Sequence, residues 1–118
     1  MIVISRITLE DDLERLVGEI NSAAWDEANE ISAYDAEDLA TYLAHQETVF
    51  VACHDVVDEN RVLLGIASAR LEIKPYDRAR WLYVDEVDVC ADQRRRGAGS
   101  ALMQALIRVA DESDCEEV

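Results

Sequence analysis

Residues 94–100 read Arg-Arg-Arg-Gly-Ala-Gly-Ser and combine positive charge with small residues in a pattern that could bind an anion. Strand-forming residues precede this turn, and apolar residues at helical spacing follow it. The turn is therefore predicted to lead from a buried strand into the N-terminus of a helix. The first N–H groups of a helix lack intrahelical partners, and the helix dipole adds partial positive charge there. Glycine also lets a phosphate approach the backbone, so we predict a phosphate-binding turn.

Two common phosphate-binding motifs do not describe this turn. It does not end in Gly-Lys-Ser/Thr, so it is not a Walker A loop. It contains a single Gly-x-Gly without an acidic strand end at the usual distance, so it is not the dinucleotide-binding fingerprint either.

Three acidic residues, Asp85, Glu86 and Asp88, lie on the predicted strand before the turn. Strict alternation would place residues 83, 85 and 87 on one face and 84, 86 and 88 on the other, unless a bulge resets the count. A carboxyl group buried beside a hydrophobic strand would have a raised pKa, which suits a base for an ammonium substrate. The alternative interpretation is that Asp85 and Glu86 are surface acids.

The turn Arg94-x-x-Gly97-x-Gly99 resembles motif A, R/Q-x-x-G-x-G/A, of the GNAT family of N-acetyltransferases. The preceding segment 83–89, Tyr-Val-Asp-Glu-Val-Asp-Val, is similar to the fourth strand of that family, often written Y-I-E-D-L-x-V. The resemblance implies an enzyme that transfers an acetyl group from acetyl-CoA to a primary amine of a small molecule or protein.

The resemblance also implies a cofactor site. It assigns the pyrophosphate of acetyl-CoA to seven consecutive residues: Arg94, Arg95, Arg96, Gly97, Ala98, Gly99 and Ser100. In the family the fourth strand is splayed by a bulge, and its backbone pairs with the pantetheine arm. Val87, Asp88 and Val89 are expected to take that role here.

The catalytic base is expected to be an acidic residue of the same strand. Family enzymes place an acid at the positions that match Tyr83 or Asp85, and a second acid often follows at the position of Glu86. Because Tyr83 is not acidic, the candidates are Asp85 and Glu86. Family members commonly protonate the departing thiolate with a tyrosine on a later helix, which has no counterpart here.

The expected fold class is α+β, with a mixed and mostly antiparallel sheet in a single domain at residues 1–118. A strand at 1–7 precedes a helix that Thr8 would cap, with Asp11 completing a capping box and Leu9 beginning the apolar stripe. A helix from 35 or 36 to 46, strands at 48–54, 62–71 and from 80, and a helix at 97–111 should follow.

Residues 114–118 would begin a fifth strand, and the family's last helix and two last strands would be missing. The chain is therefore expected to be short at its C-terminus. A homodimer that completes the sheet would remove the open strand edge.

The composition is strongly acidic, with 26 acidic against 11 basic residues, a net charge of -15 and Lys74 as the only lysine. This charge opposes binding to nucleic acid and to anionic membranes. Adaptation to high salt is the favoured interpretation, and an acidic interaction protein is the alternative. No apolar run or signal peptide is evident, so a cytoplasmic protein is expected. The three cysteines and two histidines have no metal-ligand spacing, so no metal is expected.

Three functions stay open at this level. The first is acetyl-CoA-dependent acetylation of an amine, and the second is a non-catalytic acetyl-CoA-binding regulatory or interaction module on the same fold. The third is an acidic interaction domain without a cofactor, which would make the arginine–glycine turn accidental. The charge would favour a cationic acceptor such as a polyamine, an aminoglycoside or a protein N-terminus.

Overall fold

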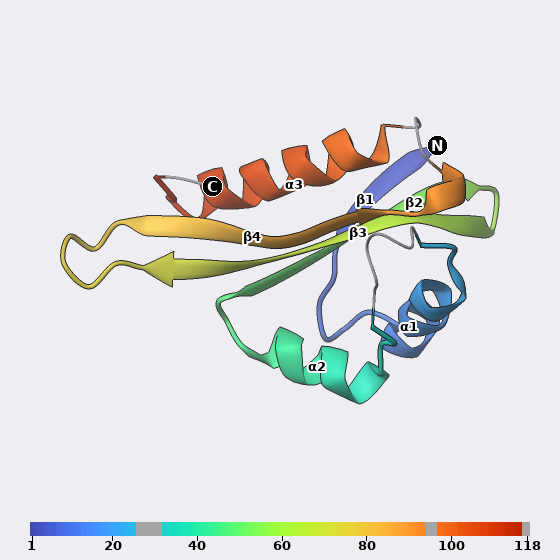
Figure 1. Cartoon of the computed structure of the whole chain (residues 1–118), viewed down its shortest axis with the longest axis horizontal. Helices are drawn as coiled ribbons and strands as arrows, with labels where there is room; N and C mark the ends of the chain where they lie inside the picture. The colour runs from blue at the N-terminus through green and yellow to red at the C-terminus, as the bar shows by residue number, and fades with distance from the viewer. Residues whose placement is uncertain (26–31, 94–96, 117–118) are drawn as a thin grey trace.

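The computed structural model describes residues 1–25, 32–93 and 97–116. In chain order the elements are β1 (Ile2–Arg6), α1 (Leu13–Ser22), α2 (Ala36–Ala44), β2 (Thr48–Val57), β3 (Asn60–Ile73), β4 (Arg80–Val89), a 3-10 turn (Ala91–Gln93) and α3 (Ala98–Glu112). The four strands form one antiparallel sheet in the order β1-β2-β3-β4. Helix α3 covers one face, and α1 and α2 cover the other (Figure 1). The predicted α+β fold and order of elements are confirmed.

The sheet has a hydrophobic core on each face. Under α3, the side chains of Leu82, Leu102 and Leu106 are almost completely buried. On the other face, Phe50 and Ile66 of the sheet pack in one cluster with Leu16, Ile20 and Leu39 of α1 and α2. Each such side chain contributes about 1.5–3 kcal/mol of burial free energy. The two cores hold the central strands between two helical layers.

The first helix begins later than the sequence predicts. Thr8 and Asp11 do form the expected pairing, since the N–H of Thr8 donates to the Asp11 carboxylate at 2.7 Å. That pairing closes a separate turn, and Leu9 is exposed. The side chain of Asp12 instead accepts from the N–H of Arg15 at 3.1 Å and caps α1. The correct N-cap is therefore Asp12, because its side chain reaches the first free N–H groups of the helix.

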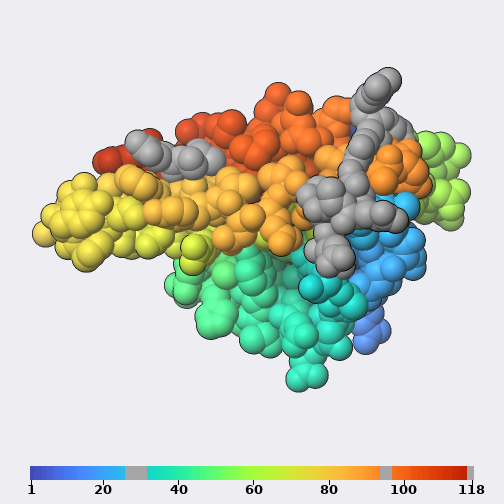
Figure 2. Space-filling view, in the orientation of Figure 1, coloured from blue at the N-terminus to red at the C-terminus, as the bar shows by residue number. Residues whose placement is uncertain are grey.

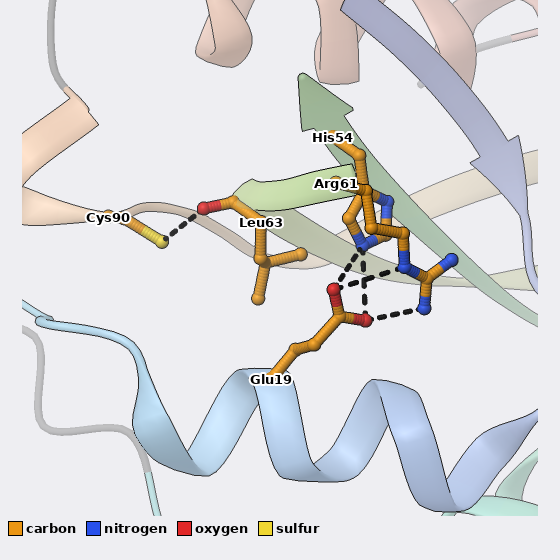
Figure 3. A network of polar contacts seen from close by, with 5 residues as sticks. All are labelled: Glu19, His54, Arg61, Leu63 and Cys90. Carbon is orange, nitrogen blue, oxygen red and sulfur yellow. Dashed lines mark hydrogen bonds and ion pairs between the residues drawn. The ribbon is translucent and has the colours of Figure 1, made fainter. Parts of the chain in front are cut away.

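A polar network joins α1 to the β2–β3 hairpin (Figure 3). Glu19 of α1 contacts Nε2 of His54 at 3.3 Å and accepts from Nε of Arg61 at 3.1 Å. The imidazole of His54 is buried, and this burial lowers its pKa, with Arg61 acting in the same direction and Glu19 opposing it. Because a carboxylate only accepts hydrogen bonds, neutral His54 donates to Glu19 through Nε2.

The β3–β4 hairpin extends beyond α2 and α3 (Figure 2). On this arm the Lys74 ammonium lies 4.2 Å from the centre of the Trp81 ring and donates to the Tyr83 hydroxyl at 2.6 Å. The only lysine of the chain is therefore held by a cation–π contact and a hydrogen bond.

The fifth strand expected at residues 114–118 is not formed within the described residues. Residues 114–116 follow α3 as turn and coil, and residues 117 and 118 lie outside the described part of the chain. One backbone contact points toward the sheet, since the N–H of Glu116 donates to the carbonyl of Arg80 on β4 at 2.7 Å. None of the helices in the described residues is long and apolar enough to cross a membrane.

Candidate active site

A β-bulge in β4 sets which of its acidic side chains face α2. Glu86 pairs with Ser68 of β3 and Val84 pairs with Ala69, so that Asp85 has no residue opposite it. The alternation therefore shifts by one position at Asp85. As a result Val84 and Val87 both pack against the core under α3. The side chains of residues 83–88 therefore do not alternate strictly between the two faces. The alternative, a bulge that resets the alternation, is present.

The bulge directs Glu86 into a cavity between α2 and the sheet. This cavity has a volume of about 330 Å³. Its lining residues come from the segment before α2, from α2 and from the strands: Ser32, Ala33, Tyr34, Asp35, Asp38, Leu39, Tyr42, Phe50, Ser68 and Glu86. The volume lies near the lower end of the range for small-molecule sites, roughly 300–1,000 Å³. A small acceptor could therefore reach the Glu86 carboxyl group.

Glu86 and Asp88 lie on the same face of β4 and form a carboxyl pair. The pKa of Glu86 is raised from its usual 4.5 by burial, by the charge of Asp88 and by a hydrogen bond between the two carboxyl groups. Asp88 is 8% exposed, and its Oδ2 has no hydrogen-bond partner among the described residues. Burial, and after it the charges of Glu86 and Asp88, raise the pKa of Tyr34 to about 12. A carboxyl group with a raised pKa is a stronger base toward an ammonium proton.

Asp85, the other predicted base, has a different environment. Its side chain is exposed, as is that of Glu86, but its Oδ1 lies 3.6 Å from Nε of Arg70 on β3. Burial raises the pKa of Tyr42, and the charge of Asp85 acts in the same direction. Asp85 does not line the cavity as Glu86 does.

Beyond the carboxyl pair, β4 leads to the start of α3. Val87 and Val89 pack against the core under α3, and β4 is an edge strand in the part of the chain that the structure describes. A Cβ placed on Gly99 would lie 3.6 Å from Cγ2 of Val89, which is ordinary contact. The end of β4 and the first turn of α3 therefore lie against each other.

Gly97 is the N-cap of α3 and has a φ of 81°, in the left-handed region that favours glycine. It has no side chain that could cap the helix, so the first N–H groups of α3, from Ala98 to Ser100, are not capped by it. A Cβ on Gly97 would meet no atom of the described residues within 4 Å, so these residues leave space over the turn. The three arginines that were predicted to bind the pyrophosphate, Arg94, Arg95 and Arg96, lie outside the described residues.

No group of three or more His, Cys, Asp or Glu side chains that could hold a metal ion occurs in the described ranges 1–25, 32–93 and 97–116.

The acetyltransferase (GNAT) family model matches residues 11–118 of this sequence. The chain belongs to the GNAT acetyltransferase family. The match spans α1, the bulged β4 and the turn before α3, so it covers all parts of the candidate site. None of the curated proteins matches the sequence significantly.

Solved structures of other acetyltransferases have the same fold. An aminoglycoside acetyltransferase from an uncultured soil metagenomic sample, in complex with sisomicin, is 23% identical with a TM-score of 0.75 over 99% of this chain and 74% of that chain. A ribosomal-protein-alanine N-acetyltransferase from Brucella melitensis biovar Abortus 2308 is 22% identical, with a TM-score of 0.73. The match covers 98% of this chain and 76% of that chain. A GNAT family acetyltransferase from Staphylococcus aureus is 13% identical, with a TM-score of 0.75. The match covers 98% of this chain and 82% of that chain. At these identities the likeness establishes the fold alone.

The sequence did not indicate the aromatic walls of the cavity. Tyr34, Tyr42 and Phe50 lie on three different segments, and only the packing of α2 on the sheet brings them together. Trp25 packs at the edge of the core and donates through Nε1 to the carbonyl of Ile20 at 2.8 Å. Residues 26–31, between α1 and α2, lie outside the described residues.

Proposed function

We propose that this protein transfers the acetyl group of acetyl-CoA to a primary amine. The observation that carries this proposal is the position of Glu86. Its side chain lines a small cavity between α2 and the sheet. Glu86 belongs to β4, the strand that leads into the glycine turn at the start of α3. A cofactor at the turn and an amine in the cavity would therefore approach the same strand from two directions.

The residues at the start of α3 fit the pyrophosphate of acetyl-CoA. The uncapped N–H groups after Gly97 are donors, and the helix dipole favours an anion there. The absence of a Cβ on Gly97 leaves room over the backbone. We assign Gly97, Ala98, Gly99 and Ser100 to the pyrophosphate, and Arg94, Arg95 and Arg96 to its charge.

The outer edge of β4 fits the extended arm of the cofactor. Residues 87–89 belong to β4, which pairs with β3 along one edge. Among the described residues, no strand pairs with the other edge of β4. The side chains of Val87 and Val89 are held by the core under α3, which fixes the backbone between them. An extended ligand could pair with this edge in the same way as an added strand.

Glu86 is proposed as the base rather than Asp85. The incoming amine is an ammonium ion at neutral pH and must lose a proton before its nitrogen can attack. Glu86 faces the cavity and has a raised pKa, whereas Asp85 pairs with Arg70. Bound acetyl-CoA would supply the acetyl group as a thioester, so that a carbon–nitrogen bond forms as the carbon–sulfur bond breaks.

The alternative is a non-catalytic acetyl-CoA-binding regulatory or interaction module. It shares the cofactor site at α3 and differs in having no turnover. A cytoplasmic location, a salt-adapted source and a homodimer that completes the sheet stay predictions.

Calorimetric titration with acetyl-CoA tests the cofactor site. The wild-type protein should bind in a saturable way, and the double variant Gly97→Glu with Gly99→Glu should bind at least about tenfold more weakly, since it adds bulk and negative charge at the pyrophosphate site. Gly18→Glu is the matched control, because it adds the same side chain at an open position on α1. Circular dichroism would establish that all variants fold. Equal binding by the double variant and the control would refute the assignment.

Turnover separates the two functions. Mass spectrometry of a panel of amines incubated with acetyl-CoA should detect acetylated products that depend on the protein. Saturable acetyl-CoA binding without any product would favour the non-catalytic module.

A further inference from the structure

The cavity under α2 receives carboxyl groups from two separate elements. Glu86 comes from β4, and Asp35 and Asp38 come from the beginning of α2. None of the described residues that line it is a lysine, arginine or histidine. These residues therefore supply no cation that could neutralise the acids.

The two acids of α2 are not equivalent. Oδ1 of Asp35 accepts from the N–H groups of Glu37 at 2.8 Å and Asp38 at 3.2 Å, and so serves as the helix cap. The carboxylate of Asp38 makes no hydrogen bond or ion pair with any described residue. Asp38 is thus the carboxylate on α2 that is available to a ligand.

A second observation, at a carboxyl group that neighbours Glu86 without lining the cavity, points to a cationic ligand. Asp88 is 8% exposed, its Oδ2 lacks a partner among the described residues, and it interacts with Glu86 and Tyr34 of the cavity wall. Asp88 shares a hydrogen bond with Glu86, but burying its Oδ2 without a partner is costly unless a cation compensates it. An ammonium group at Glu86 would provide that compensation.

The remaining walls suit an alkyl chain between two such groups. Tyr34, Tyr42 and Phe50 are aromatic, and Leu39 is apolar and buried. Aromatic faces attract ammonium groups and also contact methylene groups. The volume of about 330 Å³ suits a small, slender acceptor better than a folded protein segment.

We propose that the acceptor is a linear diamine or polyamine. One ammonium group lies at Glu86 and Asp88 and is acetylated, and the second lies at Asp38. The reacting nitrogen loses two protons, one to Glu86 and then to solvent, and one that leaves with the coenzyme A thiol. The products are the N-acetylamine and coenzyme A. This inference rests on the proposed acetyl transfer and adds the class of acceptor.

The test compares two amines of equal chain length, 1,5-diaminopentane and 1-aminopentane. Calorimetric titrations at constant ionic strength, with and without coenzyme A, should give an affinity at least about tenfold higher for the diamine. Asp38→Asn should abolish most of this preference, because it should weaken the binding of the diamine far more than that of 1-aminopentane. Asp111→Asn on α3 removes the same charge outside the cavity and should change neither affinity.

Three results would overturn the inference. These are equal affinities for the two amines, no measurable binding of the diamine, or an equal loss in Asp38→Asn and Asp111→Asn, which would indicate diffuse attraction to an acidic protein. The proposed function is judged separately by acetyl-CoA binding and product formation. Acetylation of monoamines without a preference for the diamine would refute this inference and leave the proposed function intact.

Discussion

Glu86 lies opposite Ser68 across the β3–β4 ladder, one residue after the unpaired Asp85. If the pairing of Val84 with Ala69 continued without a bulge, Asp85 would take the place opposite Ser68. Glu86 would then lie opposite Ala67, which belongs to the core under α3. One extra residue thus places Glu86 instead of Asp85 opposite Ser68 and keeps the charge of Glu86 out of the hydrophobic core.

Glu86→Gln should remove the base without removing the cofactor site. We expect kcat/KM for an acetylated amine to fall by about 10²-fold or more, the usual contribution of a general base. Acetyl-CoA binding, measured by calorimetry, should not change. Asp85→Asn is the control, because Asp85 pairs with Arg70 and does not line the cavity. A comparable loss in both variants would contradict the assignment of Glu86.

Asp88→Asn should change the pH dependence of the reaction. The charge of Asp88 and its hydrogen bond raise the pKa of Glu86. Without them that pKa falls, so Glu86 becomes a carboxylate at lower pH. The rising limb of the pH–rate profile should then move to lower pH, whereas Asp111→Asn should leave it in place. An unmoved limb in Asp88→Asn would show that the pair does not set the basicity of Glu86.

Gly65→Ala should destabilise the protein. A Cβ at this position would lie 2.6 Å from the backbone oxygen of Asp88 and 3.1 Å from Cδ1 of Leu102. Overpacking of this kind costs about 1–3 kcal/mol. Gly18→Ala on α1 meets nothing within 4 Å and should stabilise the protein by about 0.5–1 kcal/mol through helix propensity. Urea unfolding of both variants would measure the contrast, and a neutral Gly65→Ala would argue against the close approach of β3 and β4.

The stability of the protein should fall on acidification through His54. Burial lowers the pKa of His54 below 6.5 in the folded protein, so the unfolded chain binds this proton first as the pH falls. This contribution is therefore fully present above pH 6.5 and is lost between 6.5 and the lowered pKa. His54→Gln should have a smaller slope of unfolding free energy against pH between about 5 and 8. An identical reduction in the control His45→Gln would contradict this origin.

Salt should stabilise the protein. A net charge of -15 on 118 residues favours expansion by self-repulsion, and salt screens that repulsion. Urea unfolding should give a free energy that rises from low salt to molar NaCl. The triple variant Glu10→Gln, Glu59→Gln and Glu112→Gln removes three exposed charges and should show a weaker rise. An equal rise of the unfolding free energy in both proteins would indicate that salt acts by strengthening hydrophobic burial and not by screening charge.

Local patterns explain why the fold and the glycine turn could be predicted. Alternating and helical spacing of apolar residues reports which side of an element is buried, and this information lies within a few neighbouring residues. Gly97 likewise has the left-handed conformation that a turn before a helix favours. The start of α1 was mispredicted because Thr8 and Asp12 are both competent caps, and only the packing of α1 selects between them.

By itself, the sequence determined the α+β fold, the order of its elements and the glycine-containing start of α3, because these depend on local conformational preferences. Only the tertiary structure decided that Glu86 faces the cavity, because the bulge arises from the pairing of β4 with β3. It also decided that Tyr34, Phe50 and Ser68 share a wall with Glu86. Contacts between residues so distant in the chain depend on how the helices pack on the sheet, which no local pattern records.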